Sequence, residues 1–457
     1  MKRFALVALL AAMLFGVASS ASATELKVKG NIDVYGMWSA NLQDFDSDKA
    51  DGDNYMTTQR MRTYFSYVAN ENLKAVLGLE MDNIWGDGPA SDWGTDGKGN
   101  IEVKHAYLDF NFPDTAINVK AGLQYVALPS VFGNPVFDDD AAALVVSAPI
   151  NDMFGLTAGY TRGYDGSTNV SGTEGIDNDD KDMAFIAAPI TLDGFSIAPY
   201  FGYAWVGENT DNSKDFTTTP IEIGVDDDGN AIYWDGVTYT KDAGITDDMT
   251  IWVVGANAAL TMFDPFKLEA DLIYGEGEND DYETNGWYAA LAASYKMDMV
   301  TPILFGTYAG GADDSDDEDN YLPTLAEGQG LTPYIGGVRA FSTTFDSFAT
   351  DALGVGFNDS DGTGLWTVGL TLDKISFIEN LSHKLTLVYA EGTSDKDADV
   401  GFDEKDSAWE AYFVNKYMIY ENLAAINELG YFAPDFDDDD REDDASYFAT
   451  VGFSYKF

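Results

Sequence analysis

Two closely spaced arginines are the side chains of this sequence best suited to electrostatic chemistry. Only six arginines occur in 457 residues, and Arg60 and Arg62 are separated by a single position. In a strand, side chains two apart lie on one face, so both guanidinium groups would form a fixed positive patch. We place this patch in an aqueous lumen, because an arginine that faces lipid costs about 2–4 kcal/mol at the membrane midplane. Neutralisation of the nearby Glu80 and Asp82 is the structural alternative.

The two histidines, His105 and His383, give little support for catalysis or metal binding. Cysteine is absent, which excludes disulfides and Cys metal sites, and no nucleophile motif accompanies either histidine. We therefore expect no enzymatic activity, no cofactor and no bound metal. Lys74 is assigned to the basic wall that contains the arginine pair, and Lys120 and His105 are further candidates for it.

Acidic residues occur in bursts within a chain whose net charge is −53. This charge excludes nucleic acid as a partner, because phosphate contacts need clustered Lys and Arg. Asp395, Asp397 and Asp399 have the spacing of a calcium-binding loop, but Val400 replaces the required turn glycine and Asp406 the bidentate glutamate. We interpret the bursts as solvated loops; cation enrichment at a channel mouth, divalent-cation binding and cation bridging to lipopolysaccharide phosphates are the alternatives. The bursts are residues 177–182, 226–228, 313–319, 395–406 and 435–444.

The last twelve residues indicate which elements position these charges. Their side chains alternate, and the bulky face consists of Tyr447, Ala449, Val451, Phe453, Tyr455 and Phe457. The opposite face is mostly small and polar. Alternation with period two is typical of a strand, and this division suits a wall with hydrocarbon outside and water inside. An edge strand of a soluble β-sandwich is the alternative for this segment.

Similar alternating runs recur along the chain, separated by long polar loops and very short turns in alternation. This asymmetry is typical of transmembrane barrels, and Trp and Tyr gather at the ends of the runs, as interfacial girdles require. We predict one all-β domain, a transmembrane antiparallel β-barrel over residues 24–457, with 18 strands or, because 312–363 is difficult to assign, 16. The expected strands are 26–42, 55–68, 74–85, 101–112, 116–126, 143–150, 153–164, 181–191, 195–207, 249–263, 266–276, 284–297, 302–310, 364–373, 383–392, 407–419, 422–432 and 446–457.

The first 23 residues have the organisation of a secretory signal peptide. Lys2 and Arg3 form a positive start, an apolar stretch follows, and Ala21-Ser22-Ala23 is a small-residue cleavage site. We expect cleavage after Ala23, so that the mature chain begins at Thr24 outside the cytoplasm.

Several segments together resemble the general diffusion porins of the Gram-negative outer membrane, including those of sulfate-reducing and related bacteria. The resemblance rests on the runs 29–36, 59–68 and 71–80, the signal peptide and the terminal Phe457. It implies a homotrimer, and a third external loop, here residues 127–142, that folds into the barrel. The acidic side of the constriction would then be Asp138, Asp139 and Asp140. The C-terminal Phe453, Tyr455 and Phe457 would be the signal read by the barrel-assembly machinery.

These observations predict an outer-membrane porin that passes small hydrophilic solutes and ions by passive diffusion, with a weak preference for cations. A substrate-specific channel of the sugar type and a non-transporting surface protein or adhesin are the alternatives. The expected partners are two further copies of the chain and outer-membrane lipid, including lipopolysaccharide that divalent cations would bridge to the acidic loops.

Overall fold

The structure is a computed structural model that describes residues 24–457 with internal gaps. The gaps are residues 42–44, 49–53, 87–99, 166–179, 208–220, 226–230, 235–247, 281–282, 315–317, 326–363, 399 and 439–440. The predicted signal peptide, residues 1–23, also lies outside the described residues. Among the described residues, no helix is long and apolar enough to cross a membrane.

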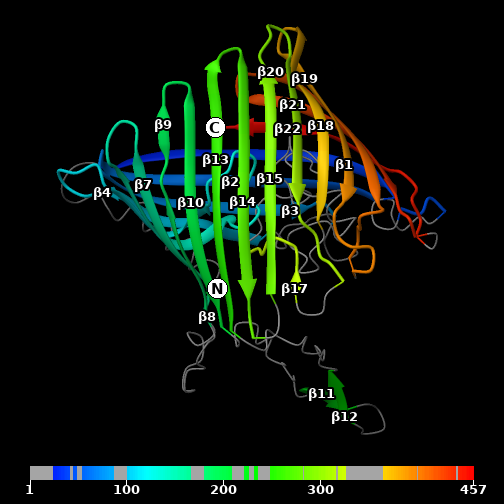
Figure 1. The fold of residues 1–457 in the computed structure, drawn as a ribbon, viewed down its shortest axis with the longest axis horizontal. Helices are drawn as coiled ribbons and strands as arrows, with labels where there is room; N and C mark the ends of the chain where they lie inside the picture. The colour runs from blue at the N-terminus through cyan, green and yellow to red at the C-terminus, as the bar shows by residue number, and fades with distance from the viewer. Residues whose placement is uncertain are drawn as a thin grey trace.

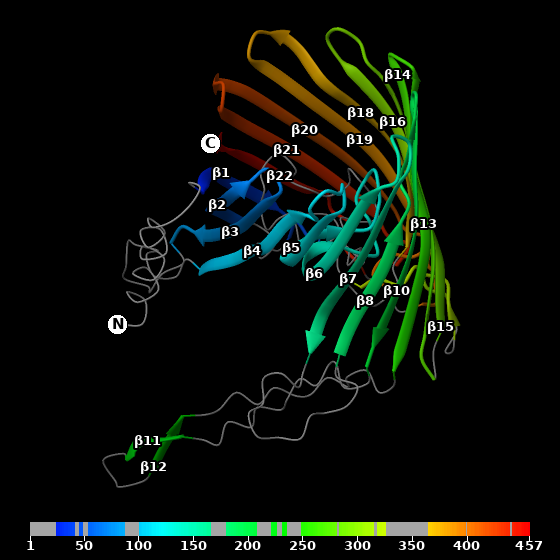
Figure 2. The same ribbon diagram turned by 90° about the vertical axis from the view of Figure 1, so that its left-hand side faces the viewer.

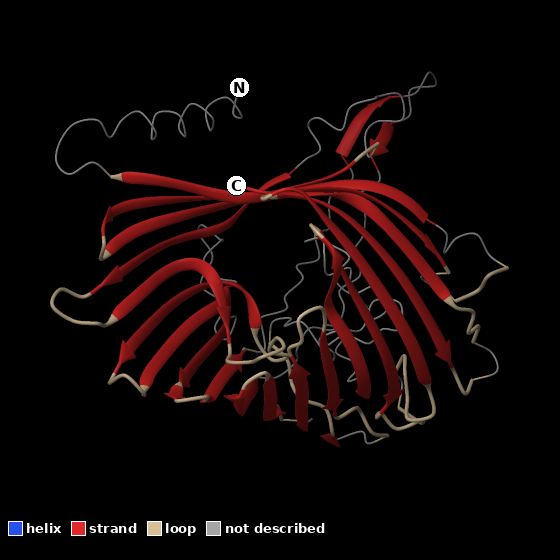
Figure 3. Cartoon of the chain, turned by 90° about the horizontal axis from the view of Figure 1, so that it is seen from above, coloured by secondary structure: helices blue, strands red, loops and turns tan. Residues whose placement is uncertain are grey.

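Antiparallel strands form a closed ring, in chain order from the first to the last (Figures 1 and 3). The ring has 18 strands when β8 and β9, which both pair with β10, are taken as two halves of one strand. Its members are β1 (Glu25–Ala40), β2 (Asn54–Asn70), β3 (Leu73–Ile84), β4 (Asn100–Asn111), β5 (Asn118–Ala127), β6 (Asp138–Pro149), β7 (Gly155–Asp165), β8 (Asp180–Ala187), β9 (Ile190–Leu192), β10 (Phe195–Val206), β13 (Met249–Phe263), β14 (Phe266–Glu278), β15 (Glu283–Tyr295), β16 (Thr301–Ala309), β18 (Leu365–Ile378), β19 (Leu381–Gly392), β20 (Ser407–Tyr420), β21 (Leu423–Asp435) and β22 (Ser446–Lys456).

Three short strands stand outside the ring. β11 (Ile221–Val225) and β12 (Ala231–Trp234) form a separate hairpin, which Figure 2 shows beyond one end of the barrel. β17 (Glu318–Asp319) pairs in parallel with the start of β15. The prediction of an all-β transmembrane barrel is therefore confirmed, and the strand number is 18 rather than 16.

The ring closes where the first strand meets the last. Asn31 pairs with Lys456, and the ladder continues to Ala40 and Tyr447. Backbone hydrogen bonds between Gly30 and Phe457 extend it, with N···O distances of 2.8 and 2.9 Å. No edge of the ring is therefore left open for pairing with another chain.

Each strand divides its side chains between an outer apolar face and an inner face. On β22, Phe453 is 53% exposed and Tyr455 38% exposed, whereas the alternating Phe448 and Thr450 are buried inside. Exposed apolar side chains are normal on a surface that meets lipid, and would be costly over so much of a soluble protein. The alternation read from the C-terminal sequence is thus the one observed.

Aromatic side chains on the outer face meet near the long-loop ends of the strands. The ring centroids of Trp38 and Tyr55 are 4.8 Å apart. Those of Tyr274 and Trp287 are 4.6 Å apart, and further pairs continue the row on neighbouring strands. Amphipathic rings of this kind are typical of the headgroup level of a membrane. They mark the height at which the wall leaves the hydrocarbon.

Three predicted strands differ clearly from those observed, and one of them is β18, which continues to Ile378 beyond the predicted end at 373. The run 181–191 is broken after Ala187, because Pro189 has no N–H to donate to the ladder. β6 begins at Asp138, five residues before the predicted start, and this changes the interpretation of the acidic residues there.

Candidate functional site: charged groups and inward segments of the lumen

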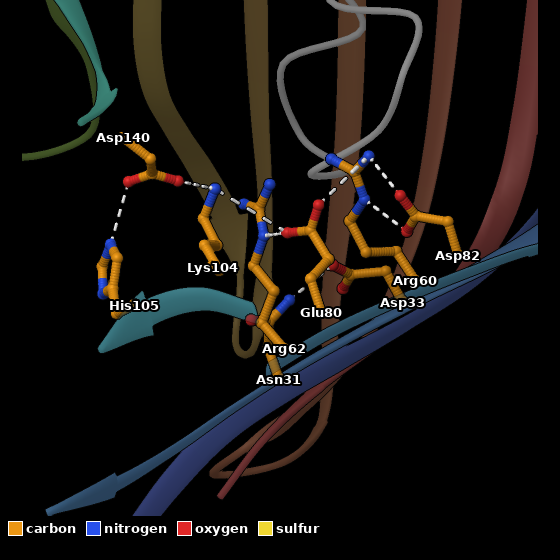
Figure 4. A network of polar contacts seen from close by, with 9 residues as sticks. All are labelled: Asn31, Asp33, Arg60, Arg62, Glu80, Asp82, Lys104, His105 and Asp140. Atoms are coloured by element: carbon orange, nitrogen blue, oxygen red, sulfur yellow. Dashed lines mark hydrogen bonds and ion pairs between the residues drawn. The ribbon is translucent and has the colours of Figure 1, made fainter. Parts of the chain in front are cut away.

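The arginine pair lies on the inner face of β2 and is fully engaged with carboxylates of β3 (Figure 4). Arg60 donates to both carboxylate oxygens of Asp82, at 2.6 and 2.7 Å, and lies 3.7 Å from Glu80. Arg62 donates to Glu80. This follows from the strand register, which sets Arg60 opposite Asp82 and Arg62 opposite Glu80. Bidentate geometry makes such pairs strong and rigid.

The network continues onto β4 and β6 (Figure 4). Lys104 lies 3.9 Å from Glu80 and also pairs with Asp140, whose other carboxylate oxygen is 2.9 Å from His105 Nε2. A bulge inserts Lys104 between the paired residues of β4, and an extra residue of this kind allows neighbouring side chains to turn to one face. Alternating cations and carboxylates thus cross four strands of the inner wall.

The predicted basic wall is present on the inner face, but it is not a bare positive patch. The arginine pair makes the ion pairs with Glu80 and Asp82 that we gave as the structural alternative. Lys74 does not join this network; its ammonium group lies 3.0 Å from Asp109, nearer the short-turn end of the wall.

The placement of the acidic residues in the third loop was wrong. Asp138, Asp139 and Asp140 are the first three residues of β6, paired with Ala127, Val126 and Tyr125 of β5. The loop itself is residues 128–137. The physical reason is that the backbone ladder of β5 and β6 continues through the acidic run. Only Asp140 meets the basic wall, because the pairing of β4 with β5 ends at Ala106 and Leu123 and leaves Lys104 and His105 accessible to it.

The β5–β6 loop is anchored to the inner face of β14 by one carboxylate. Asp271 is 3% exposed and accepts a hydrogen bond from the Ser130 hydroxyl at 2.6 Å. It also accepts from the backbone N–H groups of Val131, at 2.9 Å, and Phe132, at 3.2 Å. β14 is far from β5 along the chain, so the loop lies within the barrel against a distant part of the wall.

A second inward segment, residues 318–325, packs against the same loop. The Leu325 N–H donates to the Val136 carbonyl at 2.9 Å, and the Lys181 ammonium donates to the Leu325 carbonyl at 2.7 Å. Leu322 is buried beside the loop residues in one apolar cluster. Asn134 of the loop donates to the Tyr200 hydroxyl of β10 at 2.8 Å. The loop 128–137 is thus held against β10 and β14, and the segment 318–325 is held against that loop, β8 and β15.

Sequence reasoning missed Asp271 and the inward path of 318–325. The alternation of β14 was a usable signal for Asp271, because it places that residue opposite the outward Leu272. No pattern in the sequence indicates which donors reach it, since these come from a loop 140 positions away.

Two external loops, residues 393–406 and 436–445, form a packed cluster at the long-loop mouth. The Phe402 ring is buried against Phe436, and the Arg441 guanidinium lies 3.7 Å from the Phe436 ring centroid. Asp406 accepts from the Asp437 N–H at 2.9 Å, and burial raises the pKa of the Asp406 carboxyl above its usual value. The described acidic residues include no group arranged to hold a metal ion. Asp395 instead accepts from the backbone N–H of Asp397 in a local turn.

Comparisons with known proteins identify the fold of this chain. No family model matches the chain, and no curated protein matches it. Among solved structures, Pseudomonas aeruginosa OpdL is 11% identical with a TM-score of 0.52, covering 95% of this chain and 98% of the other. Pseudomonas aeruginosa OccK11 (OpdR) is 10% identical with a TM-score of 0.51, covering 95% and 97%. The outer membrane channel DcaP of Acinetobacter baumannii is 15% identical, with a TM-score of 0.45 and coverage of 96% and 99%.

The chain has the fold of the bacterial outer-membrane porins. Within that class it is an 18-stranded barrel, with an apolar outer face suited to the outer membrane, a charged inner wall and two segments folded against the inside.

Proposed function

We propose that this protein is a water-filled channel that passes small hydrophilic solutes and ions through the outer membrane by passive diffusion. The observation that carries the proposal is the row of charged side chains across the inner wall behind an apolar outer face (Figure 4). Charged groups of this number are stable inside a barrel only where water or partner charges surround them. The porin fold supports the same conclusion.

The channel is proposed to prefer cations weakly. Arg60 and Arg62, which would oppose cations, are neutralised by carboxylates. The loops at the long-loop mouth carry many more acidic than basic residues, and the whole chain has a net charge of −53. A mouth with one sign of charge raises the local concentration of counter-ions. The electric field of the acidic loops therefore determines that the channel prefers cations to anions.

Reconstitution in planar bilayers tests both statements. We expect stepwise conductance increases in KCl, and a reversal potential in a tenfold KCl gradient whose sign shows preference for K⁺. A reversal potential whose sign shows preference for Cl⁻ would refute the cation preference. An absence of conductance from correctly folded barrels would refute the channel and favour a surface protein such as an adhesin.

A substrate-specific channel is the second candidate. The observation that favours it is the pair of inward segments, 128–137 and 318–325, which are held to each other and to the wall rather than lying free at the mouth. Such a channel would show saturable block of its ion current by one solute. A panel of neutral sugars, amino acids and dicarboxylates, added singly, distinguishes it from general diffusion, for which no solute would saturate.

The assembly state and the membrane partners are also proposed. We propose a homotrimer in which lipopolysaccharide contacts the acidic loops, with divalent cations as bridges, and a C-terminal signal of Phe453, Tyr455 and Phe457 that the barrel-assembly machinery reads. The outward position of Phe453 and Tyr455 supports access to that signal. Mass measurement of the detergent-solubilised protein, with and without EDTA, tests the trimer and the cation bridges. A monomer under both conditions would exclude the trimer.

A further inference from the structure

Besides Lys27 and Lys267, which pair with Glu25 and Glu269, six lysines gather on the inner face of the wall at the short-turn end of the barrel. They lie on an unbroken arc of strands that passes through the junction of β22 with β1. In order around the arc they are Lys120 on β5, Lys74 on β3, Lys29 on β1, Lys456 on β22, Lys416 on β20 and Lys384 on β19.

Strand pairing shows that these side chains face inward. Lys416 pairs with the buried Ile426, while its neighbour Tyr417 is exposed on the outer face. Lys456 pairs with Asn31, whose amide belongs to the inner network, and follows the outward Tyr455. The same alternation places the other lysines on the inner face.

Most of these lysines are not neutralised. Lys74 pairs with Asp109 at 3.0 Å. Within the described part of the chain, no carboxylate lies within 4.0 Å of the ammonium groups of four of them: Lys29, Lys120, Lys416 and Lys456. The ammonium group of Lys29 lies over the Tyr64 ring. Asp109 interacts with Lys120 as well as with Lys74, and the lysines of the arc outnumber the carboxylates on its inner face, in a protein that is otherwise strongly acidic.

The opposite mouth has the opposite sign, and the cations of the wall between the mouths are paired with carboxylates. The long-loop segments 393–406 and 436–445 are dominated by aspartate and glutamate, with Lys396, Lys405 and Arg441 as their basic residues. Between the two ends, the arginine pair and Lys104 are matched by carboxylates. The pore is therefore acidic at the long-loop mouth and carries the lysine arc at the opposite end.

We propose that this arrangement makes the channel rectify, with the lysine arc as an anion-accumulating vestibule in series with a cation-accumulating mouth. The proposal goes beyond the passive channel on which it rests. When the long-loop side is positive, cations leave the acidic mouth and anions leave the lysine arc, and both move into the pore. The carrier concentration inside then rises. At the opposite polarity both carriers are drawn out of the pore, and the current falls.

Current–voltage curves of single oriented channels test the proposal. At 0.1 M KCl we expect the current at +150 mV on the long-loop side to exceed that at −150 mV by a factor of about 1.5 or more. At 1 M KCl this current ratio should approach 1, since the screening length shrinks from about 10 Å to about 3 Å. Orientation is read with Asp397→Cys, an exposed loop position in a chain without cysteine. A membrane-impermeant, positively charged thiol reagent alters the current only from the long-loop chamber.

The deciding variant is K29Q/K416Q/K456Q, which should bring the ratio at 0.1 M KCl to about 1. Its matched control is K267Q/E269Q, which removes an ion pair of 2.6 Å on the inner face near the same end without changing the net charge, and which should leave the ratio unchanged. A symmetric wild-type curve at 0.1 M, rectification of the opposite sign, or an unchanged ratio in the triple variant would each overturn the proposal. A conductance that is equal at both polarities would overturn the rectification and leave the proposed channel function intact. The absence of all conductance would overturn the rectification and the channel function together.

Discussion

Removal of the Asp271 carboxylate should release the β5–β6 loop from the wall. The carboxylate accepts one hydroxyl and two backbone N–H groups from the loop. A hydrogen bond to a charged group contributes about 1.5–3 kcal/mol, and water in the lumen can replace part of this set, so we expect a net loss of about 3 kcal/mol for Asp271→Ala. That corresponds to a rise of about 100-fold in the ratio of released to anchored loop.

Single-channel recording is the assay. Asp271→Ala should show a larger mean conductance, or long excursions to a larger level, because a released segment no longer narrows the lumen. Asp271→Asn keeps one acceptor oxygen and should fall between Asp271→Ala and the unsubstituted protein. Glu269→Ala is the matched control, since Glu269 lies two residues away on the same strand and pairs only with Lys267 among the described residues. Wild-type conductance and noise in a folded Asp271→Ala barrel would refute the anchoring role.

Three further predictions concern the wall, its closure and its mouth. Arg60→Met should lower barrel stability by about 1–3 kcal/mol, because it leaves the Asp82 carboxylate, whose side chain is 37% exposed, without its bidentate partner. Adding Asp82→Leu should recover part of this loss in heat-modifiability gels; equal midpoints for the single and double variants would contradict it. Deletion of Phe457 removes both backbone hydrogen bonds to Gly30 and should reduce the yield of folded barrel in the outer membrane, whereas a normal yield would show that the junction needs no such closure. Because burial raises the pKa of Asp406, the mouth cluster is more stable with that carboxyl protonated and loses stability as pH rises from the usual Asp pKa through the raised value. Asp406→Asn should remove this pH dependence in hydrogen exchange of residues 401–406, and a persistent dependence would assign it to another group.

Most of the barrel could be predicted from the sequence because its physical signal is local. A strand between lipid and water must alternate, and every predicted strand has an observed counterpart. The failures have local causes too. Pro189 interrupts a run that otherwise reads as continuous, and the acidic start of β6 reads as a loop because Asp is rare in strands.

The site was less predictable because its contacts are long-range. The inner position of Arg60 and Arg62 follows from parity and from the cost of charge in lipid. Their neutralisation depends on the register of β2 and β3, which alternation alone does not determine. The anchoring of the loop by Asp271 depends on the path of a chain segment across the lumen. No local pattern encodes that path.

The distribution of charge follows from where each level of the molecule meets water. Carboxylates in the wall lie beside cations, as Asp82 does, or accept hydrogen bonds from neutral donors, as Asp271 does, because an uncompensated charge between lipid and a narrow lumen is costly. Excess acidic charge is free to accumulate only in the long loops, where solvent and salt screen it. The selectivity between cations and anions would then arise mainly at the mouths, and the anchored loop would set the width of the pore and hence its conductance. Neutralising loop carboxylates should therefore change the reversal potential with little effect on conductance in 1 M KCl, whereas releasing Asp271 should do the reverse. A variant of the loops that changed both equally would show that the two functions are not separated.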